Sequence, residues 1–412
     1  MTEPSTADRI ARHIEELSGP GYTLAPECVR RYAFVAPFLR TLAYVRGKLE
    51  ELGFQVRLDG VGNLIARNVP DGTPAFGLGS HCDSNRNGGR YDGILGVVTA
   101  IEVARLARER RLELPLQVIS FVEEEGSGFG QPLLGSRIMA GDISEHDLRA
   151  SLRSLDDGLS FWEHASAAGL APESWSEAAQ ALQSLTGWLE MHIEQGRVLQ
   201  EHRCRLGVVT GIAGQVRAEV RAEGRADHAG STPMNLRQDA AVVAAEAVLE
   251  LERLAVRAGK GTVGTVGQIR LEPGLPNVIA GHAEVSLDVR GSDDSAVEGL
   301  ISGIRGFIEN SASSRGMRAS LSVLTRISAT PLEPGLCKAL EDSARATGTD
   351  LLSMTSGALH DTVMMARHVP SAMLFIPCRD GISHSPEEYA DVEDAALAAE
   401  VMLAAIQRWL DR

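Results

Sequence analysis

The sequence predicts an α/β protein whose main domain is a mainly parallel sheet flanked by helices, with an α+β domain inserted into it. Several apolar strands each end near a residue that can bind a metal ion. A glycine-rich turn between a strand and a helix, residues 79–96, carries a histidine and two aspartates. Because α/β sheets bind ligands at the carboxyl ends of their strands, these residues are expected to meet at one sheet edge.

The first of these strands ends at a histidine. The apolar run 76–80 leads into His81 and Asp83, and side chains two apart on an extended segment share a face. Asp83 can therefore orient the imidazole of His81 by accepting its second ring N–H. Asp92, just before a helix expected to begin near Ile94, is the second candidate ligand.

The strand predicted at 116–122 ends in three glutamates, 123–125. Neighbouring carboxylates raise one another's pKa unless a cation lies among them, so this position favours a metal site. Two more histidines occur in the same context. His192 lies in an alternating apolar and polar run, and His384 follows the strand predicted at 373–377.

The pattern changes between residues 211 and 326. We expect strands at 215–223, 262–271, 283–290 and 318–325, and helices at 236–258 and 295–308. The order βαββαβ matches a four-stranded, ferredoxin-like sheet with two helices on one face. The predicted domains are therefore a discontinuous metal-binding catalytic domain, 1–210 and 327–412, and an inserted lid and dimerisation domain, 211–326.

Six motifs follow one another along the chain. They are Gly79-Ser80-His81-x-Asp83, Asn87-Gly88-Gly89-Arg90-Tyr91-Asp92-Gly93, Glu124-Glu125-Gly126-Ser127, His192-Ile193-Glu194-Gln195-Gly196, His228-Ala229-Gly230-Ser231-Thr232-Pro233-Met234 and Gly381-Ile382-Ser383-His384-Ser385-Pro386. In this order they resemble the dinuclear-metal amidohydrolases of the M20 peptidase superfamily. The similar branch holds N-carbamoyl-L-amino acid hydrolases, β-ureidopropionases and allantoate amidohydrolases.

The resemblance implies two divalent metal ions per subunit, bridged by Asp92. His81 and His192 would complete one site, and Glu125 and His384 the other. Mixed nitrogen and oxygen ligands accept zinc, manganese, cobalt or nickel. The family order of base, ligand, Gly, Ser makes Glu124 the general base and leaves Glu123 outside the chemistry.

The resemblance also assigns residues that face the substrate. His228 would stabilise the oxyanion from the partner subunit of a homodimer, and Asn277 and Arg290 would hold a substrate carboxylate. An arginine fork suits a planar carboxylate, although an arginine at a strand end, taken alone, is more typical of a surface ion pair. Gln195, in His192-x-x-Gln195-Gly196, is expected to contact the substrate and favours the ureido branch over peptidases.

This ligand set predicts metal-dependent hydrolysis of a linear C–N bond. Two divalent ions sharing a carboxylate lower the pKa of a bound water, so that hydroxide is available at neutral pH. Glu124 can take the proton and pass it to the leaving nitrogen. With an N-carbamoyl-L-amino acid or a related ureido acid, the products would be the amino acid, carbon dioxide and ammonia.

The composition of the chain limits the classes of molecule that it is expected to bind. The chain has 412 residues, 44% of them hydrophobic, and a net charge of −15, which argues against nucleic acid and anionic membranes. A small molecule bearing a carboxylate is the expected ligand. The polar first twelve residues and five scattered cysteines predict a cytoplasmic protein without a disulfide framework.

Other functions remain open at this point. Within the same fold, the chain could be an allantoate amidohydrolase or an aminoacylase or peptidase-like hydrolase. A non-catalytic binding protein is a remote alternative, because it would need missing ligands. Departures in the turn 84–87 bear on the substrate: Arg86 adds a cation that could favour a second acidic group, or it is a solvent-facing loop residue.

Overall fold

The computed structural model describes residues 4–259 and 261–412. The chain forms two compact units, described separately below. Unit 1 comprises the described residues of Met1–Thr210, Pro331–Met354 and Leu359–Arg412, and unit 2 comprises those of Gly211–Thr330 and Thr355–Ala358. Unit 2 is thus an insertion, and its second boundary lies at residues 330 and 331, with 355–358 added, instead of at residues 326 and 327.

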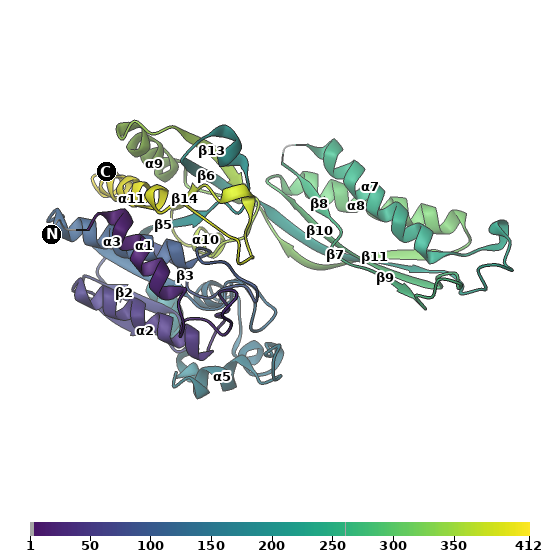
Figure 1. The fold of residues 1–412 in the computed structure, drawn as a ribbon, viewed down its shortest axis with the longest axis horizontal. Helices are drawn as coiled ribbons and strands as arrows, with labels where there is room; N and C mark the ends of the chain where they lie inside the picture. Colours follow the sequence, from purple (N-terminus) through teal and green to yellow (C-terminus); the bar gives the residue numbers. More distant parts are fainter. Residues whose placement is uncertain (1–3, 260) are drawn as a thin grey trace. The chain divides into compact units, whose positions relative to one another are not determined.

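The described part of unit 1 is built on a nine-stranded sheet flanked by helices, as predicted (Figure 1). Along the sheet the order is β1-β2-β4-β3-β5-β14-β6-β12, and β13 pairs with β6. The strands are β1 (Gln55–Leu58), β2 (Leu64–Arg67), β3 (Ala75–His81), β4 (Leu116–Phe121), β5 (Leu185–Ile193), β6 (Leu206–Ile212), β12 (Thr330–Pro331), β13 (Leu351–Ser356) and β14 (Ser371–Ile376).

The four central strands are parallel: β4 pairs with β3, β3 with β5, and β5 with β14. β3, β4 and β14 are buried along their whole length, which explains why they read as continuous apolar runs. Antiparallel pairings of β2 with β4 and of β6 with β14 extend the sheet on both sides. The sheet is therefore parallel where the candidate ligands lie.

Helices cover this sheet. α3 contacts β3, β4 and β5, whereas α10 contacts β5 and β14. Their bounds are α1 (Thr6–Leu17), α2 (Ala36–Glu51), α3 (Ile94–Glu109), α4 (Leu134–Met139), α5 (Phe161–Ala167), α6 (Val198–His202), α9 (Pro334–Ala346), α10 (Thr362–Met365) and α11 (Val392–Leu410). None of the described helices combines the length and apolar character needed to cross a membrane.

Unit 2 has the element order βαββαβ, with the second strand split in two. Its elements are β7 (Gly214–Glu223), α7 (Ala240–Ala258), β8 (Val263–Thr265), β9 (Ile269–Glu272), β10 (His282–Gly291), α8 (Asp294–Ser314) and β11 (Arg318–Ile327). The sheet order is β11-β7-β10-β8, and β9 also pairs with β10. Both helices pack on one face, where alternate residues of β7 and β10 are buried.

Candidate metal centre

The parallel strands carry the predicted ligands to one edge of the sheet in unit 1. β3 ends at His81, β4 is followed by Glu125, β5 contains His192 one residue before its end, and His384 lies in the turn after β14. The loop between β3 and α3 adds Asp92. Residues up to 303 positions apart thereby form two groups with ligand atoms within 4.8 Å of one another.

The Asp92 carboxylate lies between the two groups. Its Oδ1 is 3.5 Å from His81 Nε2 and 3.1 Å from His192 Nε2. Its Oδ2 is 3.3 Å from His384 Nε2, and that nitrogen is 3.4 Å from Glu125 Oε2. Each carboxylate oxygen therefore faces a different set of ligands, as a bridging carboxylate would.

These distances fit a pair of divalent ions. Ligands at the metal bond lengths typical of zinc lie about 3.3 Å apart in a tetrahedron. His192 Nε2 and Glu125 Oε1 are buried atoms without a hydrogen-bond partner among the described residues, which a coordinated ion would supply. Three protein ligands in each group also leave a position for water or substrate, as in catalytic metal sites.

The electrostatics of the metal-free centre point the same way. Burial, and then the neighbouring Asp92, raise the pKa of Glu125 to about 7. Burial also raises the pKa of Glu124 well above its usual range, and the Asp361 and Glu125 carboxylates add to the increase. A bound cation would oppose this rise in pKa, so metal binding is coupled to proton loss from these carboxyl groups.

Glu124 lies beside the ligands without belonging to either group. Its Oε2 is 3.7 Å from His81 Nε2, and the residue is 8% exposed. Asp83 fixes the backbone here, because its two carboxylate oxygens accept the N–H groups of Glu124 and Glu125 at 3.2 and 3.1 Å. The Asp83 carboxylate is also 3.4 Å from His81 Nδ1, but its main-chain oxygen is nearer, at 3.2 Å.

Glu123 has a separate position from the two glutamates that follow it. Its φ is +56°, and its carboxylate accepts the N–H groups of Ala33, Gly128 and Phe129. Burial raises its pKa to about 8. These contacts organise the loop that leaves β4.

Gln195 is partly buried and lies against the candidate ligands. Its φ is +58°, and its Nε2 donates to Asp92 Oδ2 at 2.7 Å while lying 3.3 Å from His384 Nε2. The structure therefore places this predicted substrate residue directly against the Asp92 carboxylate.

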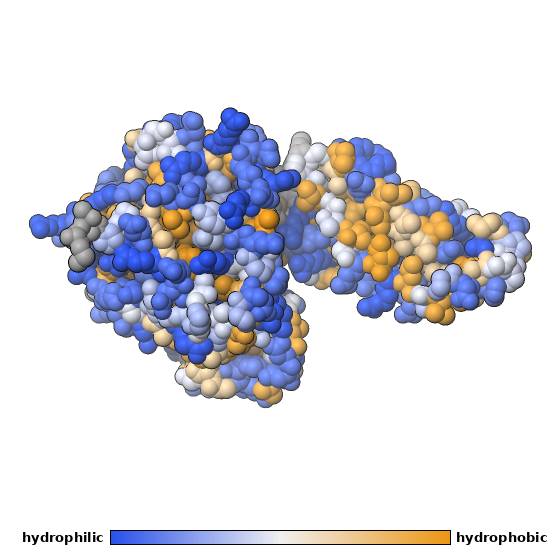
Figure 2. Space-filling model, in the orientation of Figure 1, coloured by the Kyte–Doolittle hydropathy of each residue, from blue (hydrophilic) through white to orange (hydrophobic). Residues whose placement is uncertain are grey.

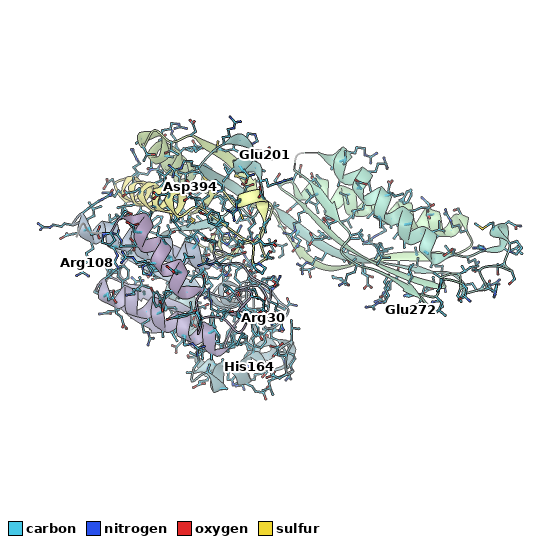
Figure 3. The ribbon with its side chains drawn as sticks, in the orientation of Figure 1. Arg30, Arg108, His164, Glu201, Glu272 and Asp394 are labelled. Atoms are coloured by element: carbon cyan, nitrogen blue, oxygen red, sulfur yellow. The ribbon has the colours of Figure 1, made fainter. Side chains whose placement is uncertain are left out.

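Arg86 is not a free cation. Its Nε donates to Ser127 O at 2.8 Å, its Nη1 to Asp156 Oδ1 at 2.7 Å, and its guanidinium lies over the Tyr32 ring. Its own carbonyl oxygen accepts from Arg30, which is labelled in Figure 3. Because Asp156 compensates the charge of Arg86, the ground for expecting a second acidic group on the substrate is removed.

The sequence reasoning missed a buried carboxylate, Glu388. Its Oε1 accepts the N–H groups of Tyr91 and Asp92 at 2.8 and 3.0 Å, and its Oε2 accepts from Ser383 at 2.8 Å. The same Ser383 hydroxyl oxygen lies 3.1 Å from Asp92 Oδ2. Glu388 thus joins the loop of the bridging ligand to the turn that carries His384. The available signal was the acidic pair at 387 and 388.

A second set of supporting residues lies behind His192. The His360 ring packs edge-on against it at 4.6 Å, and burial lowers the pKa of His360 well below its usual range, so that ring is neutral. Buried Glu190 accepts from Ser80 and Thr362 at 2.7 Å. These contacts fix the ends of β3 and β5 beneath the centre.

His228, Asn277 and Arg290 belong to unit 2. The loops of the first two lie together, because Ala229 N donates to Asn277 O at 3.0 Å. Arg290 donates to Asp288 through Nε at 2.9 Å and Nη2 at 3.3 Å, and to Gly357 O through Nη1. Three of its five N–H groups are thus engaged within unit 2.

A family model for peptidase family M20/M25/M40 matches residues 69–408. An N-carbamoyl-L-amino-acid amidohydrolase of Paenarthrobacter aurescens is 36% identical over 421 aligned residues, covering 100% of this chain and 99% of the relative. A ureidoglycolate hydrolase of Oryza sativa subsp. japonica is 34% identical, covering 98% and 84%.

Solved structures agree. An amidase of the hydantoinase/carbamoylase family from Burkholderia multivorans superposes with a TM-score of 0.88 at 30% identity, covering 98% of this chain and 97% of that one. The fold and the site define a hydrolase of the amidohydrolase class. The chain belongs to peptidase family M20/M25/M40, which confirms the resemblance seen in the motifs.

Proposed function

We propose that this protein hydrolyses the linear C–N bond of an N-carbamoyl-L-amino acid or a related ureido acid, with two divalent ions held by His81, His192, Asp92, Glu125 and His384. The observation that carries the proposal is the Asp92 carboxylate, whose two oxygens face two separate ligand groups while Glu124 stands beside them. When bound, the ions supply a hydroxide at neutral pH and polarise the scissile carbonyl.

Glu124 moves the proton in this proposal. Its burial raises the pKa of its carboxyl group, which favours holding a proton between the two halves of the reaction. The carboxylate accepts a proton from the attacking water and donates it to the leaving nitrogen. Asp83 keeps this carboxylate and Glu125 in register through the two backbone bonds described above.

His228 suits the role of a hydrogen-bond donor to the oxyanion. Its Nδ1 accepts the N–H groups of Gly230 and Ser231 at 3.1 and 3.2 Å, so the ring proton lies on Nε2. The exposed ring therefore presents a donor. We assign the substrate carboxylate to Asn277 and to the two N–H groups of Arg290 that Asp288 and Gly357 leave available.

We further propose a homodimer formed through unit 2. Figure 2 shows apolar residues gathered over α7, where Val242, Leu249 and Val256 are spaced seven apart and are 39%, 66% and 78% exposed. All four residues of β9, at the sheet edge, are exposed as well. An exposed edge strand beside an apolar helix face favours pairing with a second copy about a twofold axis. His228 would then act in the partner's site.

The deciding experiment measures ammonia release by protein reconstituted with Zn²⁺, Mn²⁺ or Co²⁺. We expect turnover of N-carbamoyl-L-amino acids, its loss with a chelator and its return with metal. Faster release from allantoate or ureidoglycolate would select those ureido acids. Hydrolysis of N-acetyl amino acids alone, followed as amino-acid release, would overturn the ureido assignment in favour of an aminoacylase.

The five cysteines are free, and a cytoplasmic location stays a prediction.

A further inference from the structure

The three imidazoles of the centre differ in what holds their second nitrogen. His81 Nδ1 lies 3.2 Å from the main-chain oxygen of Asp83, and His192 Nδ1 lies 2.9 Å from that of Ile193. Both rings are buried. The His384 side chain is 46% exposed, and its Nδ1 lies 3.4 Å from the side-chain amide of Asn85. The orientation of the His384 ring therefore depends on a side chain, whereas the orientations of the His81 and His192 rings depend on main-chain oxygens.

Asn85 is held in place from both sides. The N–H and hydroxyl of Ser84 donate to main-chain oxygens in the segment 29–31, at 2.9 and 3.0 Å. On the other side, Arg86 is tied to Ser127, as described above. A side chain between two anchored neighbours can position a ligand, since its own backbone has little freedom to move away.

A metal ion at Nε2 of His384 dictates the hydrogen bond at Nδ1. The coordinated nitrogen supplies its lone pair, so the ring proton lies on Nδ1, which becomes a donor. Asn85 can accept it through Oδ1 once the amide turns by 180°. The turn gives up one weak contact, from Asn87 N–H to Asn85 Oδ1 at 3.5 Å. The metal-free orientation, with Nδ2 toward the ring, suits the opposite tautomer.

We propose that Asn85 is a positioning residue for the outer metal ion, held by Asp92, Glu125 and His384. Its amide oxygen accepts the Nδ1–H of His384, fixes the ring plane and so sets the affinity of this group alone. The inner group, which contains His81 and His192, has its own backbone acceptors and does not depend on Asn85. The inference rests on the proposed function in requiring two divalent ions.

The test is a titration of the metal-free protein with Co²⁺, followed by calorimetry and by visible absorption. Asn85→Ala is expected to weaken one of the two equivalents roughly 10- to 100-fold, the usual effect of removing a hydrogen-bond partner from a ligating histidine, and to leave the other unchanged. Asn85→Asp is expected to restore or tighten the affected equivalent, because a carboxylate accepts more strongly. Asn87→Ala, the same truncation of an exposed side chain two residues on, is the matched control.

Two results would overturn the inference alone: wild-type affinity for both equivalents in Asn85→Ala, or equal weakening of both. A wild-type chain that takes up fewer than two ions would overturn the proposed function and this inference together. Thermal unfolding of each metal-free variant shows whether a loss of metal binding is caused by a loss of folded structure. Asn85→Asp keeps nearly the same side-chain shape, so metal binding by this variant separates the hydrogen bond from a general disturbance of the loop.

Discussion

Substitution of Gly93 perturbs the geometry of the centre without replacing a candidate ligand. It precedes α3 with φ +64° and ψ −56°, and a Cβ placed on it would lie 2.2 Å from His81 Cε1. Carbon atoms in contact normally lie about 3.5–4.0 Å apart, so in Gly93→Ala the ring would have to move by more than about 1 Å. Metal–ligand bonds tolerate about 0.2 Å, and His81 would be lost as a ligand.

The same substitution strains the backbone. A side chain at positive φ costs roughly 1–3 kcal/mol, which lowers the free energy of unfolding but leaves most of a typical domain's stability. Substitutions at two other glycines of unit 1 distinguish backbone strain from a steric clash, because nothing lies within 4 Å of a Cβ on either. Gly53 has φ +88°, whereas Gly47 lies inside α2. Gly53→Ala tests strain alone, and Gly47→Ala is expected to stabilise by about 0.5–1 kcal/mol.

Urea unfolding and Co²⁺ titration of the three variants complete the experiment. We expect Gly53→Ala and Gly93→Ala to lose stability, and only Gly93→Ala to lose the inner equivalent of metal. If Gly93→Ala binds two ions with wild-type affinity, the inference that His81 is a ligand held against Gly93 is wrong.

Four further outcomes are expected. Glu124→Gln should lower kcat by roughly 10²- to 10⁴-fold with both ions still bound by elemental analysis, and unchanged turnover would remove Glu124 as the proton carrier. Arg290→Ala should raise KM for an N-carbamoyl amino acid roughly 10- to 100-fold and leave the corresponding neutral amide unaffected, whereas equal losses would argue against the carboxylate clamp. Coexpressed Glu124→Gln and His228→Ala chains, purified as the mixed dimer with two tags, should regain about half of wild-type activity if His228 acts in the partner's site, because one of the two sites then has both residues; a cis role predicts none. Metal-free protein should lose stability as pH rises from about 5 to 9: burial raises the pKa of Glu125 to about 7, and the Asp92 hydrogen bond raises that of His384 to about 9, so the folded state binds more protons than the unfolded one in this window. Each net proton contributes about 1.4 kcal/mol per pH unit, and an unfolding temperature of the metal-free protein that is flat or rises with pH would contradict the assignment.

Four of the five candidate ligands could be proposed from the sequence because they lie near or after the end of an apolar strand, and Asp92 because it precedes a helix in a glycine-rich turn. The β3 and β4 runs are buried throughout and end near the histidine and the glutamates, so the local sequence alone indicates where the edge of the sheet lies. The boundaries of some helices and strands differ from those predicted. α7 begins at Ala240 instead of residue 236, because Asp239 caps it by accepting from Ala241 N–H. The strand predicted at 262–271 is split, and Ser286 contacts Gln268 in the gap.

Glu388 and Asn85 could not be assigned from the sequence for a different reason. The bond from Asp92 N–H to Glu388 joins residues 296 positions apart, and nothing local distinguishes Glu388 from its neighbour Glu387. Asn85 lies 299 positions from His384. A ligand is recognisable by its chemistry and its place after a strand, whereas a group that orients a ligand can come from any loop that the fold brings near.

This difference bears on how the centre achieves its geometry. Asp92 reaches its position through three contacts: a glycine after it that admits the His81 ring, a carboxylate at 388 that binds its N–H, and a hydroxyl at 383 that lies 3.1 Å from its Oδ2. Gly93 is the chain neighbour of Asp92, whereas Ser383 and Glu388 lie in one distant turn and contact its carboxylate and its backbone N–H. Because both candidate ligand groups share this carboxylate, a shift of Asp92 would disturb both groups at once.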